Sequence, residues 1–92
     1  MFSEERQQRI QERIQRLLAD IDPEVHLHGV ILDSTRQQLA FVMQKGEWPV
    51  VLGMNYLDYV SHRDEQLKKQ LEEGLKLRLQ AALERQMREE EE

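Results

Sequence analysis

The chain contains no cysteine among its 92 residues. Disulfide bonds, thiolate zinc sites and cysteine nucleophiles are therefore excluded. Aromatic residues are also scarce, at 5% of the chain, and the only tryptophan and both tyrosines lie in one segment, GEWPVVLGMNYLDYV, residues 46–60. Because the rest of the chain is rich in Arg, Glu, Gln and Lys, we predict that this segment is where the chain buries its apolar surface.

Long apolar runs are also absent, since none approaches the roughly 18 residues that a membrane helix requires. The opening residues MFSEERQQRI carry charge at once and lack the apolar core of a signal peptide, so we expect a cytoplasmic protein without membrane contact. The net charge of −5 argues against a general nucleic-acid binder.

The first helix is predicted over residues 3–21, where apolar residues recur every three or four positions. Ser3 is predicted to cap its start. Asp22–Pro23 is predicted to end it, because the residue before a proline avoids the α region.

The final helix is predicted over residues 64–88, after a short helical turn over residues 55–63 that Asn55 caps. Ser61 and Asp64 have the spacing of a capping box, which predicts a fresh start near residue 62. The glutamates at residues 89–92 are predicted to form a frayed acidic tail.

Three segments between these helices are rich in β-branched residues or alternate in polarity, which predicts strands. They are residues 25–32, 39–44 and 48–52, and Gly53 is predicted to end the third. The turn residues Lys45-Gly46-Glu47 predict a hairpin between the second and third strands. By simple alternation, the face of the first strand that carries His26 and His28 continues as Val30 and Leu32.

This order predicts one α+β domain over residues 1–92: a helix, a three-stranded antiparallel sheet and a long C-terminal helix (α-β-β-β-α). A domain of this size has a small core, so association with a second copy would add burial. We therefore expect a homodimer.

The final helix is the reason to expect the second copy. Its 25 predicted residues would extend about 37 Å, against a radius of gyration of about 12 Å for a compact chain of this length. Leucines recur at every fourth position from Leu67 to Leu83, so the apolar stripe winds around the helix by about 40° per step. Gly74 would allow close approach of another helix.

Two arrangements would cover this stripe. The first helix covers it within one chain, or a second copy also packs against its far end. We favour the second, and the predicted interface residues are Leu75, Leu79, Leu83, Met87, Trp48, Tyr56 and Tyr59.

Two alternatives involve other partners. Arg6, Arg9, Arg13 and Arg16 form a basic stripe on the first helix that could contact nucleic-acid phosphates, although neighbouring glutamates partly neutralise it. A metal could bind His26 and His28 with a third ligand from elsewhere, and a small ligand could bind an aromatic pocket lined by Trp48, Tyr56 and Tyr59.

No sequence motif predicts catalysis. The chain has no phosphate-binding P-loop, no dinucleotide-binding glycine pattern and no serine nucleophile elbow. We therefore predict no catalytic residues, no cofactor and no resident metal. The resulting hypothesis is a small, non-enzymatic, homodimeric protein-interaction or regulatory module.

Overall fold

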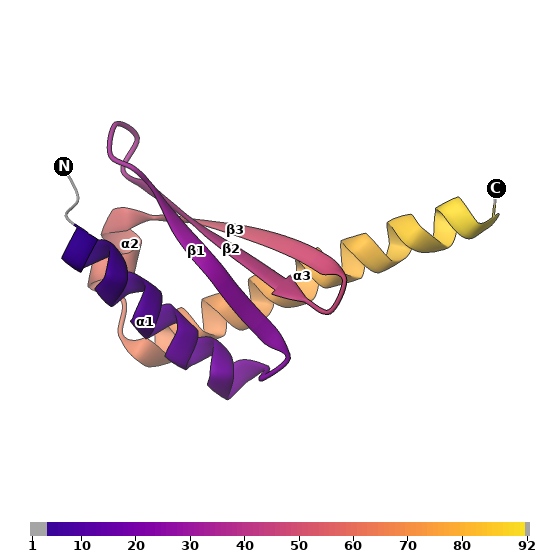
Figure 1. The fold of residues 1–92 in the computed structure, drawn as a ribbon, viewed down its shortest axis with the longest axis horizontal. Coiled ribbons are helices and arrows are strands. Elements are labelled where there is room, and N and C mark those ends of the chain that lie inside the picture. Colours follow the sequence, from indigo (N-terminus) through magenta and orange to yellow (C-terminus); the bar gives the residue numbers. More distant parts are fainter. Residues whose placement is uncertain (1–3, 92) are drawn as a thin grey trace.

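The computed structural model describes residues 4–91. Figure 1 shows the elements in chain order: α1 (Glu4–Ile21), β1 (Val25–Asp33), β2 (Gln38–Lys45), β3 (Trp48–Asn55), α2 (Tyr56–Ser61) and α3 (Asp64–Glu91). This confirms the predicted α+β order with its long C-terminal helix. The predicted cap Ser3 lies outside the described residues.

The three strands form one antiparallel sheet in the order β1-β2-β3, so β1 and β3 are its two edges. The predicted hairpin between β2 and β3 is confirmed, with Lys45 paired to Trp48 across the turn. Gly46 has a φ of 59° there, a conformation that glycine adopts without steric cost. β3 continues to Asn55, past the predicted end at Gly53, because Met54 keeps the buried alternation.

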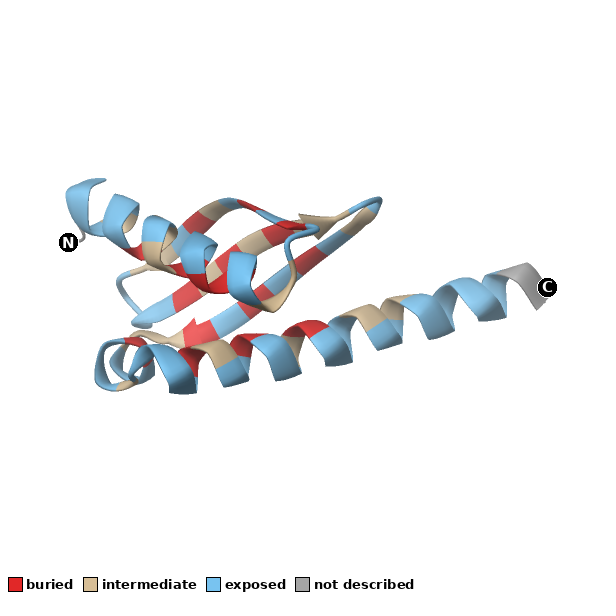
Figure 2. Cartoon of the chain, turned by 90° about the horizontal axis from the view of Figure 1, so that it is seen from below, coloured by how far each residue is buried: buried red, intermediate tan, exposed pale blue. Residues whose placement is uncertain are grey.

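One face of the sheet is covered and the other is open. α1 packs against β1, α3 packs against β3, and the two helices also contact each other. Figure 2 shows the buried positions of α1, the sheet and the first half of α3 turned toward one another. The fully enclosed side chains at the centre of this core include Ile14, Leu18, Leu39, Phe41, Met43, Leu67 and Leu71.

A β-bulge in β1 changes which residues face the core. The register shifts between Leu27 and Gly29, so the residues that follow move by one position relative to β2. His26 and His28 are exposed on the open face, whereas Val30 is buried on the opposite face with Leu27. The predicted continuation of the histidine face into Val30 and Leu32 is therefore wrong.

The junctions on either side of α2 are fixed by side-chain caps. The side chain of Asn55 accepts a hydrogen bond from the Leu57 N–H at 2.8 Å, which confirms the predicted cap of α2. The predicted capping box of Ser61 and Asp64 is wrong. The Gln66 side chain instead accepts from the Arg63 N–H at 3.0 Å, so Arg63, which directly precedes α3, takes the capping position.

The molecule is elongated, measuring 47 × 28 × 19 Å along its principal axes. α3 causes this shape, since its far half continues past the end of the sheet (Figure 1). Within the described residues, no helix has the length and apolar character to cross a bilayer. The cytoplasmic location stays a prediction.

Candidate functional site

The apolar residues of α3 become more exposed toward its C-terminal end. Leu67, Leu71 and Leu75 are buried in the core, and Leu79 is half-buried against it. Further along, Leu83 and Met87 are 53% and 55% exposed. Because the stripe winds by about 40° per step, it turns away from the sheet just where the sheet ends. An apolar surface is therefore left uncovered on the far half of α3.

The other predicted interface residues divide between the core and the surface. Leu75 and Tyr59 are buried by their own chain, so they have little area left for a partner. Tyr56 is half-buried and its ring stacks on Tyr59, with centroids 6.4 Å apart. Trp48 is half-buried beside Pro49 and the far half of α3, where Ala82, Arg85 and Gln86 line a shallow hollow.

The aromatic residues of the 46–60 segment do not meet in one pocket. Trp48 begins β3 and Tyr56 follows its last residue, so an eight-residue strand separates them. At about 3.3 Å per residue, that is roughly 26 Å. A single small-molecule pocket lined by Trp48, Tyr56 and Tyr59 is not formed, although each residue contributes to burial at its own end of β3.

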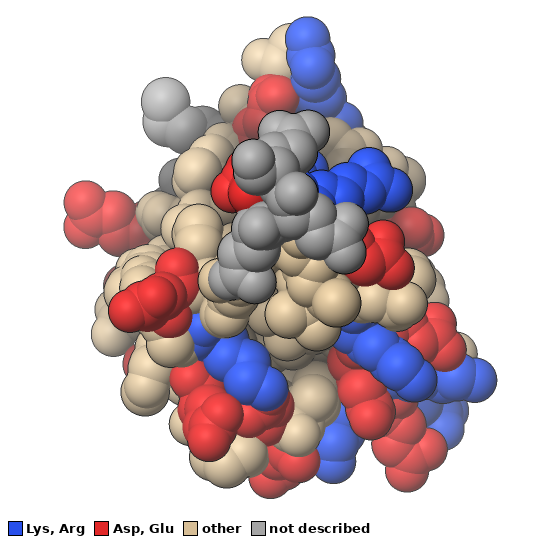
Figure 3. Space-filling model, turned by 90° about the vertical axis from the view of Figure 1, so that its right-hand side faces the viewer, with Lys and Arg blue, Asp and Glu red and all other residues tan. Residues whose placement is uncertain are grey.

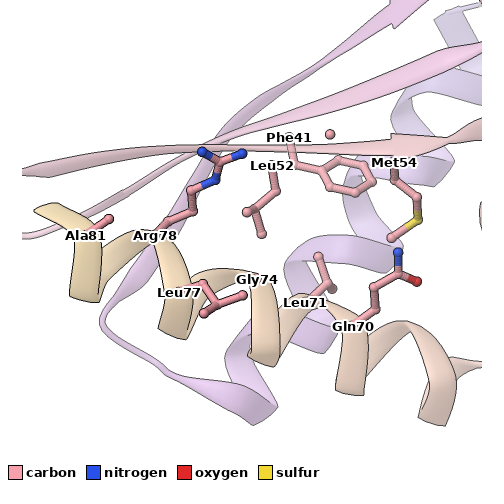
Figure 4. Close-up of a pocket in the computed structure, with 10 residues that line it drawn as sticks. Phe41, Leu52, Met54, Gln70, Leu71, Gly74, Leu77, Arg78 and Ala81 are labelled. Carbon is pink, nitrogen blue, oxygen red and sulfur yellow. The ribbon is translucent and has the colours of Figure 1, made fainter.

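A groove that the sequence did not predict lies between β3 and α3. It encloses about 360 Å³ and is lined mainly by apolar side chains (Figure 4). A Cβ on Gly74 would lie 3.2 Å from the nearest Leu52 methyl, so glycine lets α3 approach the strand closely. The predicted close approach at Gly74 therefore occurs against β3 and not against another helix. Leu77, at the rim, is 67% exposed.

The basic stripe of α1 is interrupted by a contact inside the chain. Arg13 donates to the Asp64 carboxylate at 2.8 Å and to the His62 carbonyl at 3.2 Å, and its guanidinium lies 5.1 Å from the centre of the Tyr59 ring. Burial lowers the pKa of Arg13, but contacts with Tyr59 and Asp64 outweigh it and raise the pKa above its ordinary value. Arg13 thus ties α1 to the start of α3. The remaining stripe residues, Arg6, Arg9 and Arg16, are exposed.

His26 and His28 lie on the open face of the sheet, in the edge strand β1. His28 Nε2 is 3.0 Å from Gln44 Oε1, and His26 is exposed beside it. Across residues 4–91, no group of three or more His, Cys, Asp or Glu side chains has an arrangement that could hold a metal ion. His62 is remote from this pair, at the end of α2, where its Nδ1 bonds the Asp58 carbonyl.

Charged residues elsewhere are mixed in sign. On the face in Figure 3, which looks along α3 from its C-terminal end, acidic and basic side chains alternate around neutral surface. Lys45 bonds Asp22 at 2.6 Å, which joins the β2–β3 hairpin to the end of α1. This hydrogen bond lowers the pKa of Asp22 and raises the pKa of Lys45. These features stabilise the fold and do not form a single-sign surface for a polyanion.

Comparisons of the chain with protein-family models, curated proteins and solved structures give no match. The candidate site consists of the uncovered far half of α3 and of the groove beside β3.

Proposed function

We propose that this protein is a homodimeric interaction module that binds another macromolecule and catalyses no reaction. The observation that supports it is the far half of α3, where the apolar residues Leu83 and Met87 are each more than half exposed. Exposed apolar residues scattered singly are ordinary on protein surfaces. Here they continue the same stripe that forms the core, on the part of α3 that only the first residues of β3 approach.

A second copy would cover this surface. In a two-fold dimer the same patch occurs on both chains, so the apolar side chains of one far half can pack against those of the other. Full burial of a Leu or Met side chain contributes about 1.5–3 kcal/mol. Leu83 and Met87 are each about half exposed, so a partner would add about half of that value per residue. Leu79, half-buried by its own core, would extend the contact toward the sheet.

The nucleic-acid and metal alternatives have weaker support. Arg13 is engaged with Asp64, His62 and Tyr59, which removes the middle of the proposed phosphate-binding stripe. The histidine pair lacks a third ligand among the described side chains.

Sedimentation velocity from low to high micromolar concentration tests the proposal. The parent chain is expected to shift from monomer to dimer, and the double variant Leu83→Asp/Met87→Asp is expected to stay monomeric because a dimer would bury its carboxylates. A parent that remains monomeric at high micromolar concentration would refute the homodimer.

The matched control is Leu57→Asp/Val60→Asp, which makes the same kind of change at two exposed apolar residues of α2. It is expected to dimerise like the parent. Hydrogen exchange gives a second readout, since amides in the far half of α3 should become more protected as the parent concentration rises. Equal loss of the dimer in both double variants would contradict the assignment to α3.

A further inference from the structure

The two edges of the sheet differ in how far the rest of the described chain covers them. At the β1 edge, Gln7 of α1 donates to the Val30 carbonyl at 2.8 Å, and Gln15 of α1 accepts from the Leu27 N–H at 3.3 Å. The bulge in the same strand further disrupts regular pairing there. Natural proteins protect sheet edges in such ways against unwanted pairing. The β1 edge is therefore closed to an added strand.

The β3 edge has no such cover. Pro49 pairs with Gln44 and has no N–H, so this is a non-hydrogen-bonded pair of the ladder. Since hydrogen-bonded and non-hydrogen-bonded pairs alternate in antiparallel sheets, the backbone groups of Val51 and Gly53 also point away from β2. No hydrogen bond from the described part of the chain reaches them. Two N–H groups and two carbonyls are thus free to pair.

Gly53 has no role within its own chain that requires glycine. Its φ is not in the left-handed region, and an added Cβ would meet only the Leu39 carbonyl oxygen, at an ordinary contact distance of 3.8 Å. Gly74, in contrast, lies where an added Cβ would crowd the Leu52 methyls, at 3.2 Å. A glycine inside a strand often marks a place where another backbone approaches closely. At Gly53 that backbone is not part of the described chain.

The groove beneath this edge has room for side chains. Its volume of about 360 Å³ falls within the range of roughly 300–1,000 Å³ that is typical of ligand pockets. Leu52, Met54 and Leu71 provide its apolar surface (Figure 4). Gly53 of β3 also lines it. A strand added to β3 would place alternate side chains above this groove, as strands do.

Two arginines of α3 stand beside the edge. Arg78 lines the groove, and Arg85, two helical turns further on, lies beside Trp48 and Pro49 at the start of β3. Figure 4 shows the Arg78 guanidinium reaching up to the level of the strands. Neither arginine forms an ion pair with a described carboxylate. Glu89 lines the same hollow as Arg85, so it is mainly Arg78 that gives the edge a positive charge without an ion pair among the described residues.

We propose that the β3 edge and the groove beneath it bind an extended acidic segment of another protein, which adds to the sheet as a fourth strand. Backbone groups of Val51 and Gly53 pair with the segment, apolar side chains enter the groove, and carboxylates face Arg78 and Arg85. The β3 strand of a second copy, WPVVLGMN, has no acidic residue for these arginines, so a different polypeptide fits better.

This inference rests on the interaction role proposed above, since it states where the module binds its partner. The test is selection of random decapeptides displayed on phage against the immobilised full chain, followed by fluorescence anisotropy of one enriched peptide. Enriched sequences are expected to carry apolar and acidic residues at every second position, because the groove and both arginines lie on the same face of the added strand. Enrichment of basic sequences, or no enrichment, would overturn the proposal.

Variants of the chain locate the binding. Val51→Glu, which puts a negative charge on the edge, and Gly53→Pro, which removes one of its N–H groups, are each expected to weaken the peptide about tenfold or more, the equivalent of about 1.4 kcal/mol. Ile31→Glu is the matched control, because Ile31 is equally exposed on the open face but belongs to β1. It should bind within about twofold of the parent.

Charge is tested by Arg78→Gln against Lys76→Gln, since Lys76 is exposed and lies outside the groove lining. Only Arg78→Gln should lower the affinity for the peptide.

Circular dichroism checks that each variant is folded. If Gly53→Pro does not fold, the test of the edge rests on Val51→Glu. The monomeric Leu83→Asp/Met87→Asp variant should still bind, so failure of the dimer and failure of this site are distinguishable. If Val51→Glu abolishes self-association but leaves peptide affinity unchanged, the edge pairs with a second copy and the proposal is wrong.

Discussion

The first half of α3, from Asp64 to Leu79, packs against the sheet and α1, whereas the second half, from Gln80 to Glu91, extends past them (Figures 1 and 2). The four-residue apolar spacing runs through both halves, since Leu83 and Met87 continue the leucines of the first half. The difference comes from where the sheet ends and from the winding of the stripe. An apolar pattern thus indicates that a helix has a face to cover, but only the tertiary structure shows what covers it.

The largest expected difference is in the free energy of unfolding, between a variant at a buried leucine of the stripe and a variant at an exposed one. Leu71→Ala is expected to lower the free energy of unfolding by about 2–5 kcal/mol, because it leaves a cavity in the core. Leu83→Ala should change it by less than about 0.5 kcal/mol in the monomer, where this side chain is exposed. Urea denaturation at low protein concentration measures both. Equal losses would mean that the far half is covered within one chain.

A second prediction concerns the closest contact of the covered half. Gly74→Val is expected to cost about 1–3 kcal/mol, because its side chain would collide with Leu52 and push α3 away from β3. Gln80→Val, at an exposed position beyond the groove, is the control and should cost less than about 0.5 kcal/mol. Thermal denaturation of both variants checks this. A neutral Gly74→Val would show that the Leu52 side chain shifts into the groove and makes room for the larger residue.

A third and smaller effect tests how the start of α3 is held. Arg13→Gln removes the ion pair with Asp64 and the contact with Tyr59, and is expected to cost about 1 kcal/mol because the pair is partly solvent-exposed. Arg85→Gln, in the uncovered half, should leave stability unchanged within about 0.5 kcal/mol. The urea midpoint of unfolding is measured for both variants. A larger loss of stability in Arg85→Gln than in Arg13→Gln would contradict the role given to Arg13.

The smallest effect is the pH dependence of the Asp22–Lys45 pair. The hydrogen bond from Lys45 holds the pKa of Asp22 below its ordinary value, so the pair stabilises the fold above about pH 3.9, the value for an unfolded aspartate. That stability is lost as the pH falls through the lower pKa of the folded state. Asp22→Asn should therefore be less stable than the parent at pH 7, and the difference should vanish in acid. A pH-independent difference in thermal midpoint would contradict this reasoning.

The main elements were predictable because local patterns dominate them. The periodic leucines and isoleucines identified α1 and α3, and the β-branched runs identified the strands. The Asn55 cap was also predictable, since an asparagine at a strand-to-helix junction satisfies the free N–H groups of the helix. These are contacts between residues close together in the sequence.

Features that depend on distant residues were missed or misplaced. The bulge at His28 moves Val30 to the opposite face, and a one-residue shift in register leaves little mark on composition beyond the neighbouring Gly29. The start of α3 uses Gln66 where a box from Ser61 was expected, because α2 takes up Ser61 as its own last residue.

The groove could not be predicted because it depends on which element meets Gly74. A glycine in the middle of a helix signals close approach, but not whether a helix or a strand approaches. The unprotected edge of β3 likewise becomes visible only once the sheet order places β3 on the outside and α1 beside β1.

The junction at Asn55 joins β3 directly to α2 without a loop, and the Tyr56 N–H bonds the Gln37 carbonyl of the neighbouring turn at 2.9 Å. Strand, turn and short helix are thus coupled mechanically at this end of the sheet. A change in β3 would therefore reach α3 by two routes, through α2 and through the direct packing of Leu71 and Gly74 against the strand. The far half of α3 continues the same helix, so its orientation is set by how the near half sits on the sheet.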